Sequence, residues 1–325
     1  MKALNHFGQD AKIVANTTPR SILESPHFLN AETIVFGKIF QDYSEVARRA
    51  KTLGKVLIVD ITDDPVQTER FGHIRKVAGL ADCAIVPTAQ MGAVARPWLS
   101  KGAPVVRIED PFEAEFAPPF AQFRRAPERL ELVWYGNPTN AAFLKPHLSP
   151  LEILADHVPM RLTIVSKVIK VFEDMLTSYS EQASGPLVVN FVEWTPSAQQ
   201  KAIAAADVVL LPGEAKGSSA PKSANRLISA IAGGRLAIAS PLPAYQALSE
   251  HALVVENLVQ GLSAALALPA IRIERRLAAG QDAIKRQFSP DLIGRKWVQS
   301  LATLTRQAHL SKTEVHSAAS SPESR

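Results

Sequence analysis

The sequence predicts an α/β protein with two domains, each built on a doubly wound parallel sheet. Short, continuous apolar runs alternate with amphipathic stretches along most of the chain, as buried parallel strands and their connecting helices do. This alternation breaks once, at a proline-rich stretch over residues 111–127, and then starts again. The chain has 325 residues, which is enough for two domains of ordinary size.

The first domain is expected to hold four clear parallel strands, since four short apolar runs are bounded by polar residues or glycine. These strands are Thr33–Phe36, Val56–Asp60, Cys83–Val86 and Val105–Ile108, with a fainter strand at Lys12–Ala15. The amphipathic segments between them predict helices at Tyr43–Leu53, Phe71–Ala81 and Met91–Ser100.

The second domain repeats this pattern with six apolar runs. The expected strands are Leu132–Tyr135, Leu162–Val165, Val188–Phe191, Val208–Leu211, Leu236–Ala239 and Leu253–Val255. The expected helices are Pro150–His157, Ile169–Tyr179, Ser197–Ala205, Pro221–Ala232, Leu258–Leu268 and Ile271–Gln287.

These elements divide the chain into two domains and a C-terminal extension. We expect the domains at residues 1–126 and 127–288, joined by the proline-rich stretch as a linker. A closing helix follows at residues 289–306, with an apolar stripe that includes Trp297. Residues 307–325 are rich in Ser, Glu and His, which predicts a disordered tail.

Composition excludes several classes of function. The net charge is +5 with a pI near 9.3, but no dense basic run is present and aromatic residues are only 6%, so we expect no nucleic-acid partner. This charge permits anionic substrates or contact with an anionic membrane surface.

The single cysteine, Cys83, gives neither an internal disulfide nor a zinc cluster. The chain has neither a signal-like apolar start nor a membrane-length apolar run, which predicts the cytoplasm. Nothing in the sequence indicates an oligomeric state.

A cationic helix start is the first candidate site. Lys222, Ser223, Asn225 and Arg226 occupy the first turns of a helix that follows a buried strand and a polar loop. Lys222 and Arg226 are four residues apart, so they would share a helix face. Ligands of open α/β sheets bind beyond the carboxyl ends of strands, and helix N-termini favour phosphate. The alternative is a pair of solvated surface charges.

Two other strand ends of the second domain carry candidate donor-binding residues. Gly136 and Asn137 follow its first strand, where a glycine lets backbone N–H groups approach a diphosphate. Glu193 and Trp194 follow its third strand, where the indole could stack on a nucleobase. A tight turn without a ligand explains the first pair equally well, and packing at a strand–loop corner explains the tryptophan.

The acidic turn Asp60–Pro65 is the candidate catalytic segment of the first domain. Asp63 and Asp64 lie just beyond a strand end, where carboxylates face the ligand crevice of such sheets. They could hold an acceptor hydroxyl or act as a general base. The alternative is ordinary turn and helix-capping chemistry, which the sequence Asp-Asp-Pro also suits.

Several motifs follow the predicted strands and helices of both domains. The second domain contains LVWYGN, VNFVEW, ADVVLLP and KSANRLISAIAGGRLAIASPLPAY. The first domain contains FGK, GKVLIVDITDDP, LADCAIVPT and VVRIEDPFE, and FSPDLIGRKW begins the C-terminal helix. Together these motifs resemble the GT-B fold of nucleotide-sugar glycosyltransferases, closest to the family 4, or group 1, enzymes, with FSPDLIGRKW similar to their terminal helix. The resemblance covers most of residues 31–305.

This resemblance implies two Rossmann-like domains facing a cleft, and a transferase that moves a sugar from a nucleotide-diphosphate donor to an acceptor. The second domain would bind the donor, and neither a cofactor nor a divalent ion would be required. The N-terminal domain is shortened, because residues 1–29 match the usual first strand, loop and helix poorly. Retaining members carry two glutamates spaced E-x7-E, and Pro221 and Ser229 stand at the matching positions.

Three functions therefore stay open at this point. The first is a metal-independent glycosyltransferase in which Lys222, Ser223, Asn225 and Arg226 neutralise the donor diphosphate. The second is a non-catalytic binding or scaffold protein that kept the fold and lost the chemistry. The third is a sugar-nucleotide epimerase or hydrolase on the same fold.

Overall fold

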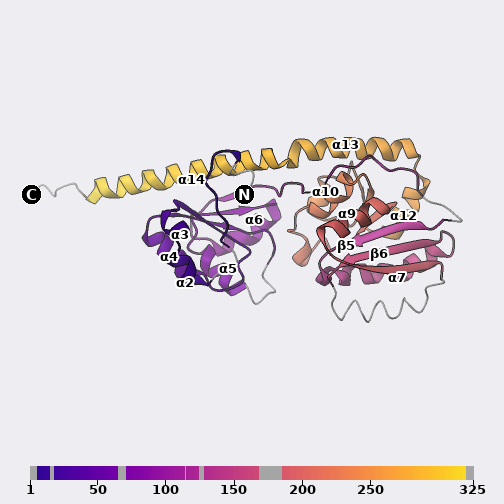
Figure 1. Cartoon of the computed structure of the whole chain (residues 1–325), viewed down its shortest axis with the longest axis horizontal. Coiled ribbons are helices and arrows are strands. Elements are labelled where there is room, and N and C mark those ends of the chain that lie inside the picture. The colour runs from indigo at the N-terminus through magenta and orange to yellow at the C-terminus, as the bar shows by residue number, and fades with distance from the viewer. Residues whose placement is uncertain are drawn as a thin grey trace, which may run out of the picture. The chain divides into compact units, whose positions relative to one another are not determined.

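The computed structural model describes residues 6–14, 18–64, 71–113, 115–123, 128–167 and 185–319. The chain forms two compact units, each with its own parallel sheet and helices (Figure 1). Unit 1 comprises residues 1–111, 221–223 and 288–325, and unit 2 comprises residues 112–220 and 224–287. The expectation of an α/β protein with two parallel sheets is confirmed.

Unit 1 contains a four-stranded sheet in the order β1-β2-β3-β4, with every pair parallel. Its strands are β1 Thr33–Gly37, β2 Val56–Asp60, β3 Cys83–Val86 and β4 Val105–Arg107. Its helices are α2 Pro19–Leu23, α3 Pro26–Asn30, α4 Ser44–Thr52, α5 Phe71–Ala78, α6 Ala89–Ala95, the 3-10 turn η1 Arg96–Trp98 and α14 Pro290–Ala319.

The sheet of unit 1 is buried on both faces, which explains why its strands read as continuous apolar runs. One face packs against α4, α5 and α6 through a core that includes Leu57, Val59 and Ala84. The other face, which includes Ile58, Cys83 and Ile85, packs against Ile293 and Leu304 of α14. The C-terminal helix is therefore part of the core of unit 1.

The helix α14 is also fixed to unit 1 by an ion pair. Lys296 donates to the carboxylate of Glu109 at 2.6 Å, just beyond β4. Burial alone would raise the pKa of Glu109, but Lys296, a backbone N–H group and Arg107 together hold it below its ordinary value.

The tail expected to be disordered from residue 307 is instead helical as far as Ala319, because α14 continues without a break.

Unit 2 contains a six-stranded parallel sheet in the order β10-β9-β8-β5-β6-β7. Its strands are β5 Leu130–Tyr135, β6 Met160–Ser166, β7 Leu187–Glu193, β8 Val208–Leu211, β9 Leu236–Ala239 and β10 Leu253–Val254. Its helical elements are η2 Pro138–Asn140, α7 Ala141–Ala155, α9 Pro196–Ala205, η3 Gly217–Ser219, α10 Asn225–Ala232, α11 Pro243–Gln246, α12 Leu258–Ala267 and α13 Ala270–Phe288.

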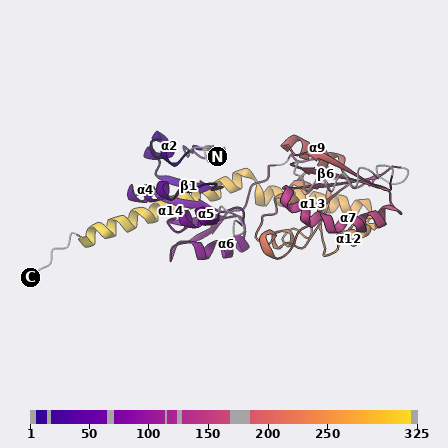
Figure 2. The same cartoon turned by 90° about the horizontal axis from the view of Figure 1, so that it is seen from below.

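The strand order of unit 2 reverses at β5, its first strand. The chain runs outward through β6 and β7, and then crosses back to β8 on the other side of β5. The helices α7 and α9 consequently lie on opposite faces of the sheet, as both views show (Figures 1 and 2). The crevice between the carboxyl ends of β5 and β8 is the topological switch point, where ligands of open α/β sheets bind.

Residues 112–113 and 115–123 belong to unit 2, and the boundary between the units falls at residue 111 rather than at residue 126. The Ala117 N–H donates to the Ala232 carbonyl at 2.9 Å, and the Phe120 N–H donates to the Gly234 carbonyl at 2.8 Å. Gln281 donates to the carbonyls of Ala117, Ile231 and Ala232 at 2.7–3.2 Å. The stretch expected to be a linker thus caps the C-terminal end of α10; we call residues 115–121 the strap.

Three other expectations need correction or fall outside the described residues. The faint strand expected at Lys12–Ala15 is irregular over residues 12–14, where Ile13 is exposed and pairs with none of the described strands. The helix expected from Pro150 begins at Ala141, because two prolines lie inside it without ending it. The helix expected at Ile169–Tyr179 lies outside the described residues.

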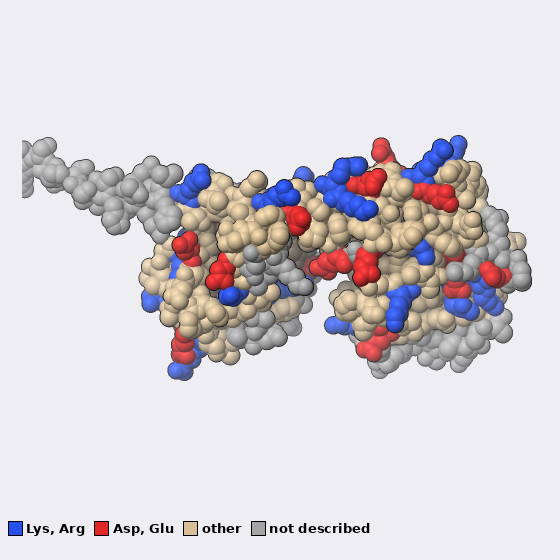
Figure 3. All heavy atoms as spheres, turned by 45° about the horizontal axis from the view of Figure 1, so that its top comes forward, with Lys and Arg blue, Asp and Glu red and all other residues tan. Residues whose placement is uncertain are grey.

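The visible surface carries no large patch of one charge (Figure 3). Lys and Arg are interspersed with Asp and Glu over the face that the figure shows, so the positive net charge does not concentrate there. Within the described residues, no helix combines the length and the apolar character that crossing a bilayer would require.

Candidate functional site

The candidate site of unit 2 is built where β5 ends and α10 begins. The expected helix from Pro221 starts instead at Asn225, because Gly217–Ser219 form a separate 3-10 turn and the following residues are irregular. Ala224 stands at the N-cap and supplies no side-chain hydrogen bond to the first turn. An uncapped helix start leaves backbone N–H groups that favour an anion.

Arg226, the second residue of α10, is directed at the end of β5. A Cβ atom at Gly136 would lie 3.4 Å from Nη1 of Arg226 and 3.2 Å from the indole of Trp134, so a larger residue would press on both. Nη1 is buried and has no hydrogen-bond partner among the described residues. A buried guanidinium nitrogen without a partner is costly and is the natural contact for an anionic ligand.

A row of hydrogen bonds joins this point to the ends of β6 and β7. The Ser166 hydroxyl donates to the Gly136 carbonyl at 2.8 Å, and the Trp194 N–H donates to the Ser166 carbonyl at 2.8 Å. The Trp194 indole donates to the Gln199 side chain at 2.8 Å and is 37% exposed. The structure thus presents a fixed, exposed indole along the same edge of the sheet as Arg226.

The remaining candidates of unit 2 are exposed, and two of them accept hydrogen bonds from residues nearby in the chain. Asn137 is exposed and accepts hydrogen bonds from the N–H and hydroxyl of Thr139, both at 3.1 Å. Glu193 is the last residue of β7 and is exposed. Asn225 is exposed at the start of α10, and its carbonyl accepts from the Ser229 hydroxyl at 2.9 Å.

Lys222 and Ser223 do not lie on the helix with Arg226, which corrects the expectation that Lys222 and Arg226 share a helix face. Both residues precede α10 in irregular chain, and both group with unit 1. The i, i+4 spacing has this meaning only inside a helix, and α10 begins after them.

The acidic turn lies in unit 1, directly after β2. Asp63 is exposed and Asp64 is half-buried. Asp60, the last residue of β2, was included in the acidic turn expected from the sequence but was not singled out there. Burial and the charge of Asp110 raise the pKa of Asp60 to about 6, while Lys38 opposes the shift. An acid at the end of an otherwise apolar, buried strand was the signal that could have identified it.

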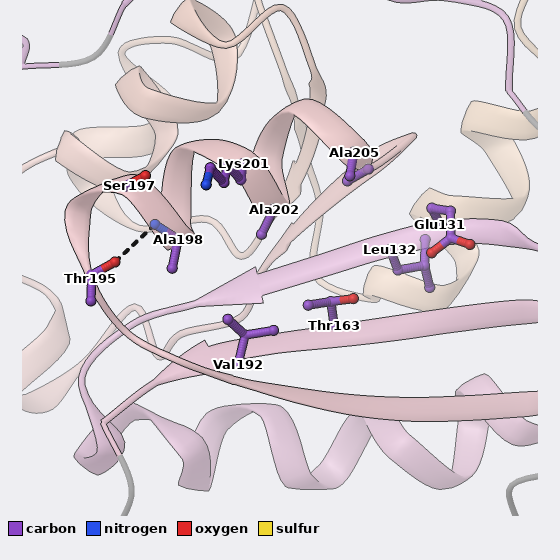
Figure 4. A pocket seen from close by; sticks show the side chains of 11 residues that line it. Glu131, Leu132, Thr163, Val192, Thr195, Ser197, Ala198, Lys201, Ala202 and Ala205 are labelled. Carbon is purple, nitrogen blue, oxygen red and sulfur yellow. Dashed lines mark hydrogen bonds between the residues drawn. The ribbon is translucent and has the colours of Figure 1, made fainter.

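Two hollows lie away from these residues. The hollow along α9 has a volume of about 430 Å³, and Ala198 and Ala202 point from the helix toward the strands that carry Thr163 and Val192 (Figure 4). Its acidic residue, Glu131, is paired with Arg161 at 2.7 Å. The other hollow, in unit 1, measures about 550 Å³ and includes Arg96, which donates to the Ala103 carbonyl at 2.8 Å. This second hollow also includes Arg107, which is paired with Glu109 at 3.1 Å, so both of its arginines already have partners. The hollow along α9 contains one lysine, Lys201.

Sequence reasoning also missed three residues that fix the unit 2 site. Tyr135, Ser166 and Gln199 hold the helix start, the Gly136 peptide and the Trp194 ring, respectively. Ser166 carried a readable signal, since it is a polar residue that ends a buried strand. Tyr135 and Gln199 carried none, because their partners are set by tertiary packing.

The chain matches no protein-family model and no curated protein sequence. Solved structures do resemble it. Anabaena HepE in complex with UDP and glucose is 11% identical, with a TM-score of 0.65 over 93% of this chain and 88% of that chain. The E. coli trehalose-6-phosphate enzyme bound with UDP-2-fluoro glucose is 12% identical, with a TM-score of 0.62 over 88% and 75%. These neighbours are GT-B glycosyltransferases.

The chain has the GT-B fold. The structure of TarM also matches, at 13% identity and a TM-score of 0.58 over 77% of this chain and 50% of TarM. The resemblance read from the sequence motifs is confirmed at the level of this fold. Unit 2 is the part of the chain in which the sequence motifs led us to expect a donor site.

One position where this GT-B chain departs from the E-x7-E pattern can be placed in the structure. Ser229 stands where the second glutamate was expected, and its hydroxyl donates back to the Asn225 carbonyl within α10. A hydroxyl held in this way is occupied inside the helix, so it does not substitute for a carboxylate that reaches a ligand.

Proposed function

We propose that the chain binds a nucleoside-diphosphate sugar at the carboxyl edge of the unit 2 sheet and transfers the sugar to an acceptor. The observation that carries this proposal is the buried Nη1 of Arg226, which lies beside Gly136 and has no hydrogen-bond partner among the described residues. A diphosphate oxygen would supply the missing partner. Solved GT-B structures that hold UDP, UDP-glucose or an analogue support this kind of donor.

The chemistry follows from the charges at this edge. Negative charge grows on the diphosphate as the sugar leaves, and a fixed guanidinium and the uncapped start of α10 would stabilise it. We propose that the exposed Trp194 ring carries the nucleobase and that Glu193 accepts from ribose hydroxyls. Because Arg226 supplies positive charge, we expect turnover to persist when divalent ions are chelated.

The test is calorimetric titration with UDP, GDP and the corresponding nucleosides. Charge-assisted hydrogen bonds contribute about 1.5–3 kcal/mol, so Arg226→Ala should weaken diphosphate binding by about tenfold to a hundredfold. Arg226→Lys should recover only part of this loss, because a lysine lacks the planar fork. Nucleoside affinity should hardly change.

Arg272→Ala is the matched control, since Arg272 is exposed on α13 of the same unit. It removes the same charge from a surface position and should leave the UDP dissociation constant unchanged. Equal UDP affinity in wild type and in Arg226→Ala would reject the donor site.

We propose further that Asp63 or Asp64 contacts the acceptor. Each follows the carboxyl end of β2, and a carboxylate there can accept a proton from an acceptor hydroxyl. Asp→Asn at the residue concerned should lower turnover while UDP affinity stays nearly constant. If neither variant lowers nucleotide release in the presence of acceptor, the two residues only form the turn.

Binding of the donor without transfer is the second candidate function. The observation that favours it is the Ser229 hydroxyl, which is held by the Asn225 carbonyl where retaining enzymes carry a glutamate. Incubation with a panel of nucleotide sugars separates the candidates. Release of free nucleotide supports the transferase or a hydrolase, and saturable binding without release supports the binding protein.

A further inference from the structure

The hydroxyl of Tyr135 is held deep in unit 2 against the start of α10. It donates to the Arg226 carbonyl at 2.6 Å, and the residue is only 1% exposed. Burial and the neighbouring Tyr245 raise the pKa of Tyr135 well above its ordinary value, although Arg226 opposes the shift. The hydroxyl therefore stays protonated and remains a hydrogen-bond donor throughout the physiological range.

The first turn of α10 needs such an anchor. Ala224 at the N-cap gives no side-chain hydrogen bond, and a helix start without a cap is less stable and frays more readily. Tyr135 acts on this turn from the neighbouring strand, because its bond reaches the second residue of the helix.

The strand end that carries Tyr135 is itself fixed. The Gly136 N–H donates to the Val165 carbonyl at 3.2 Å, and the Gly136 carbonyl accepts from the Ser166 hydroxyl at 2.8 Å. Two successive residues of the chain therefore meet the two ends of Arg226. Tyr135 holds its carbonyl, and Gly136 lies against its guanidinium.

We propose that Tyr135 is a positioning residue for the anion site, one that sets the direction of the Arg226 guanidinium by fixing the main chain of Arg226 to β5. This inference rests on the proposed function, because it assigns Tyr135 a role in binding the donor diphosphate. Tyr135 does not touch the ligand and acts through Arg226 alone. Loss of its hydroxyl lets the helix start move and spreads the guanidinium over several positions, which weakens its contact with phosphate.

The test is a double-mutant cycle of wild type, Tyr135→Phe, Arg226→Ala and the double variant, with UDP affinity and thermal unfolding measured for each. Tyr135→Phe keeps the ring and removes one oxygen, so the fold should persist with a lower melting temperature in both backgrounds. In wild type it should weaken UDP binding about threefold to tenfold. In the Arg226→Ala background it should change UDP affinity by less than about twofold, because its route to the ligand is gone.

A purely structural tyrosine would not produce this coupling. The same loss of affinity in both backgrounds, or no loss in either, would overturn the positioning role even if Arg226→Ala alone weakens binding as proposed. Unchanged affinity in Arg226→Ala, or no binding of UDP or GDP by wild type, would overturn the donor site and the role of Tyr135 together.

Discussion

Asp60 is a single carboxyl group whose surroundings make the stability of unit 1 depend on pH. Burial and Asp110 raise its pKa to about 6 from an ordinary value of 3.8, with Lys38 opposing. Between about pH 4 and pH 6 the folded chain therefore keeps a proton that the unfolded chain has lost. Raising the pH through this window should lower the free energy of unfolding, and above pH 6 the buried charge remains a cost.

Asp60→Asn removes this buried charge while keeping a similar side-chain volume. At pH 7.5 the free energy of unfolding should rise by about 1–3 kcal/mol, since each pKa unit corresponds to about 1.4 kcal/mol. At pH 4 the gain should vanish, because the aspartate is then neutral in the folded state. Urea denaturation at the two pH values measures both quantities.

Asp63→Asn is the control, because this residue is exposed three positions farther along the same turn. It should leave the pH dependence of stability as it is in wild type. An equal gain for Asp60→Asn at pH 4 and pH 7.5 would point to better packing of the amide rather than to relief of a buried charge.

The unit 2 site shows which residues a sequence discloses. The places of Gly136, Trp194 and Arg226 at strand and helix ends could be predicted, because residue type and the apolar pattern mark those ends; their contact with a ligand stays a prediction. The hydrogen bond from Tyr135 to the Arg226 carbonyl could not be predicted from the sequence, since its acceptor is a backbone atom 91 positions away. Lys222 was placed wrongly for a related reason, because its role depended on a helix start that no side chain marks.

At the scale of elements, the strap 115–121 passes very close to Gly234, just beyond the C-terminal end of α10. Gly234 has φ +69°, and a Cβ there would lie 2.2 Å from the Pro118 carbonyl oxygen. The close approach allows Ala117 and Phe120 to donate to the carbonyls of Ala232 and Gly234. A side chain at position 234 would therefore displace the strap.

Gly234→Ala should lower the free energy of unfolding much more than Gly217→Ala, which serves as its control. Gly217 has nearly the same φ, +70°, but nothing lies within 4 Å of its Cβ position. Alanine at 217 should cost about 1–2 kcal/mol for the left-handed backbone alone. Alanine at 234 should cost roughly 2 kcal/mol more, because the strap loses its two backbone hydrogen bonds. If urea denaturation shows the same loss of unfolding free energy for both variants, the strap can move away from position 234 at no cost.

The bounds of an element were predicted correctly where burial produces a clear apolar pattern in the sequence, and wrongly where it does not. The bounds of β8 and β9 match the expected runs residue for residue, because strands buried on both faces are continuously apolar. The start of α7 was missed because Pro146 and Pro150 indicate a break, yet both lie inside the helix. The strap was read as a free linker, since its binding uses backbone carbonyls that leave no trace in side-chain pattern.

At the scale of the whole molecule, the fold class followed from alternation of strand and helix, and the separate cores of the two units follow from their separate sheets. Because α14 packs only into the core of unit 1 among the described cores, detaching it should open that core and leave the core of unit 2 intact. Cys83 is fully buried in the face that α14 covers, and burial raises the pKa of its thiol to about 11. It is the one cysteine of the chain, so thiol labelling reports on unit 1 alone.

Replacing Ile293 and Leu304 together by aspartate should detach α14, because both side chains are buried against that face. Labelling of Cys83 by a thiol reagent at pH 8 should then be faster by about tenfold or more, since opening exposes the thiol. Gln299→Asp, at an exposed position of the same helix, should leave the labelling rate as in wild type. UDP affinity should not change in the double variant, because the Arg226 site belongs to unit 2 with its own core. A parallel loss of UDP affinity would instead mean that the two units unfold cooperatively, and that α14 stabilises the donor site although it lies outside unit 2.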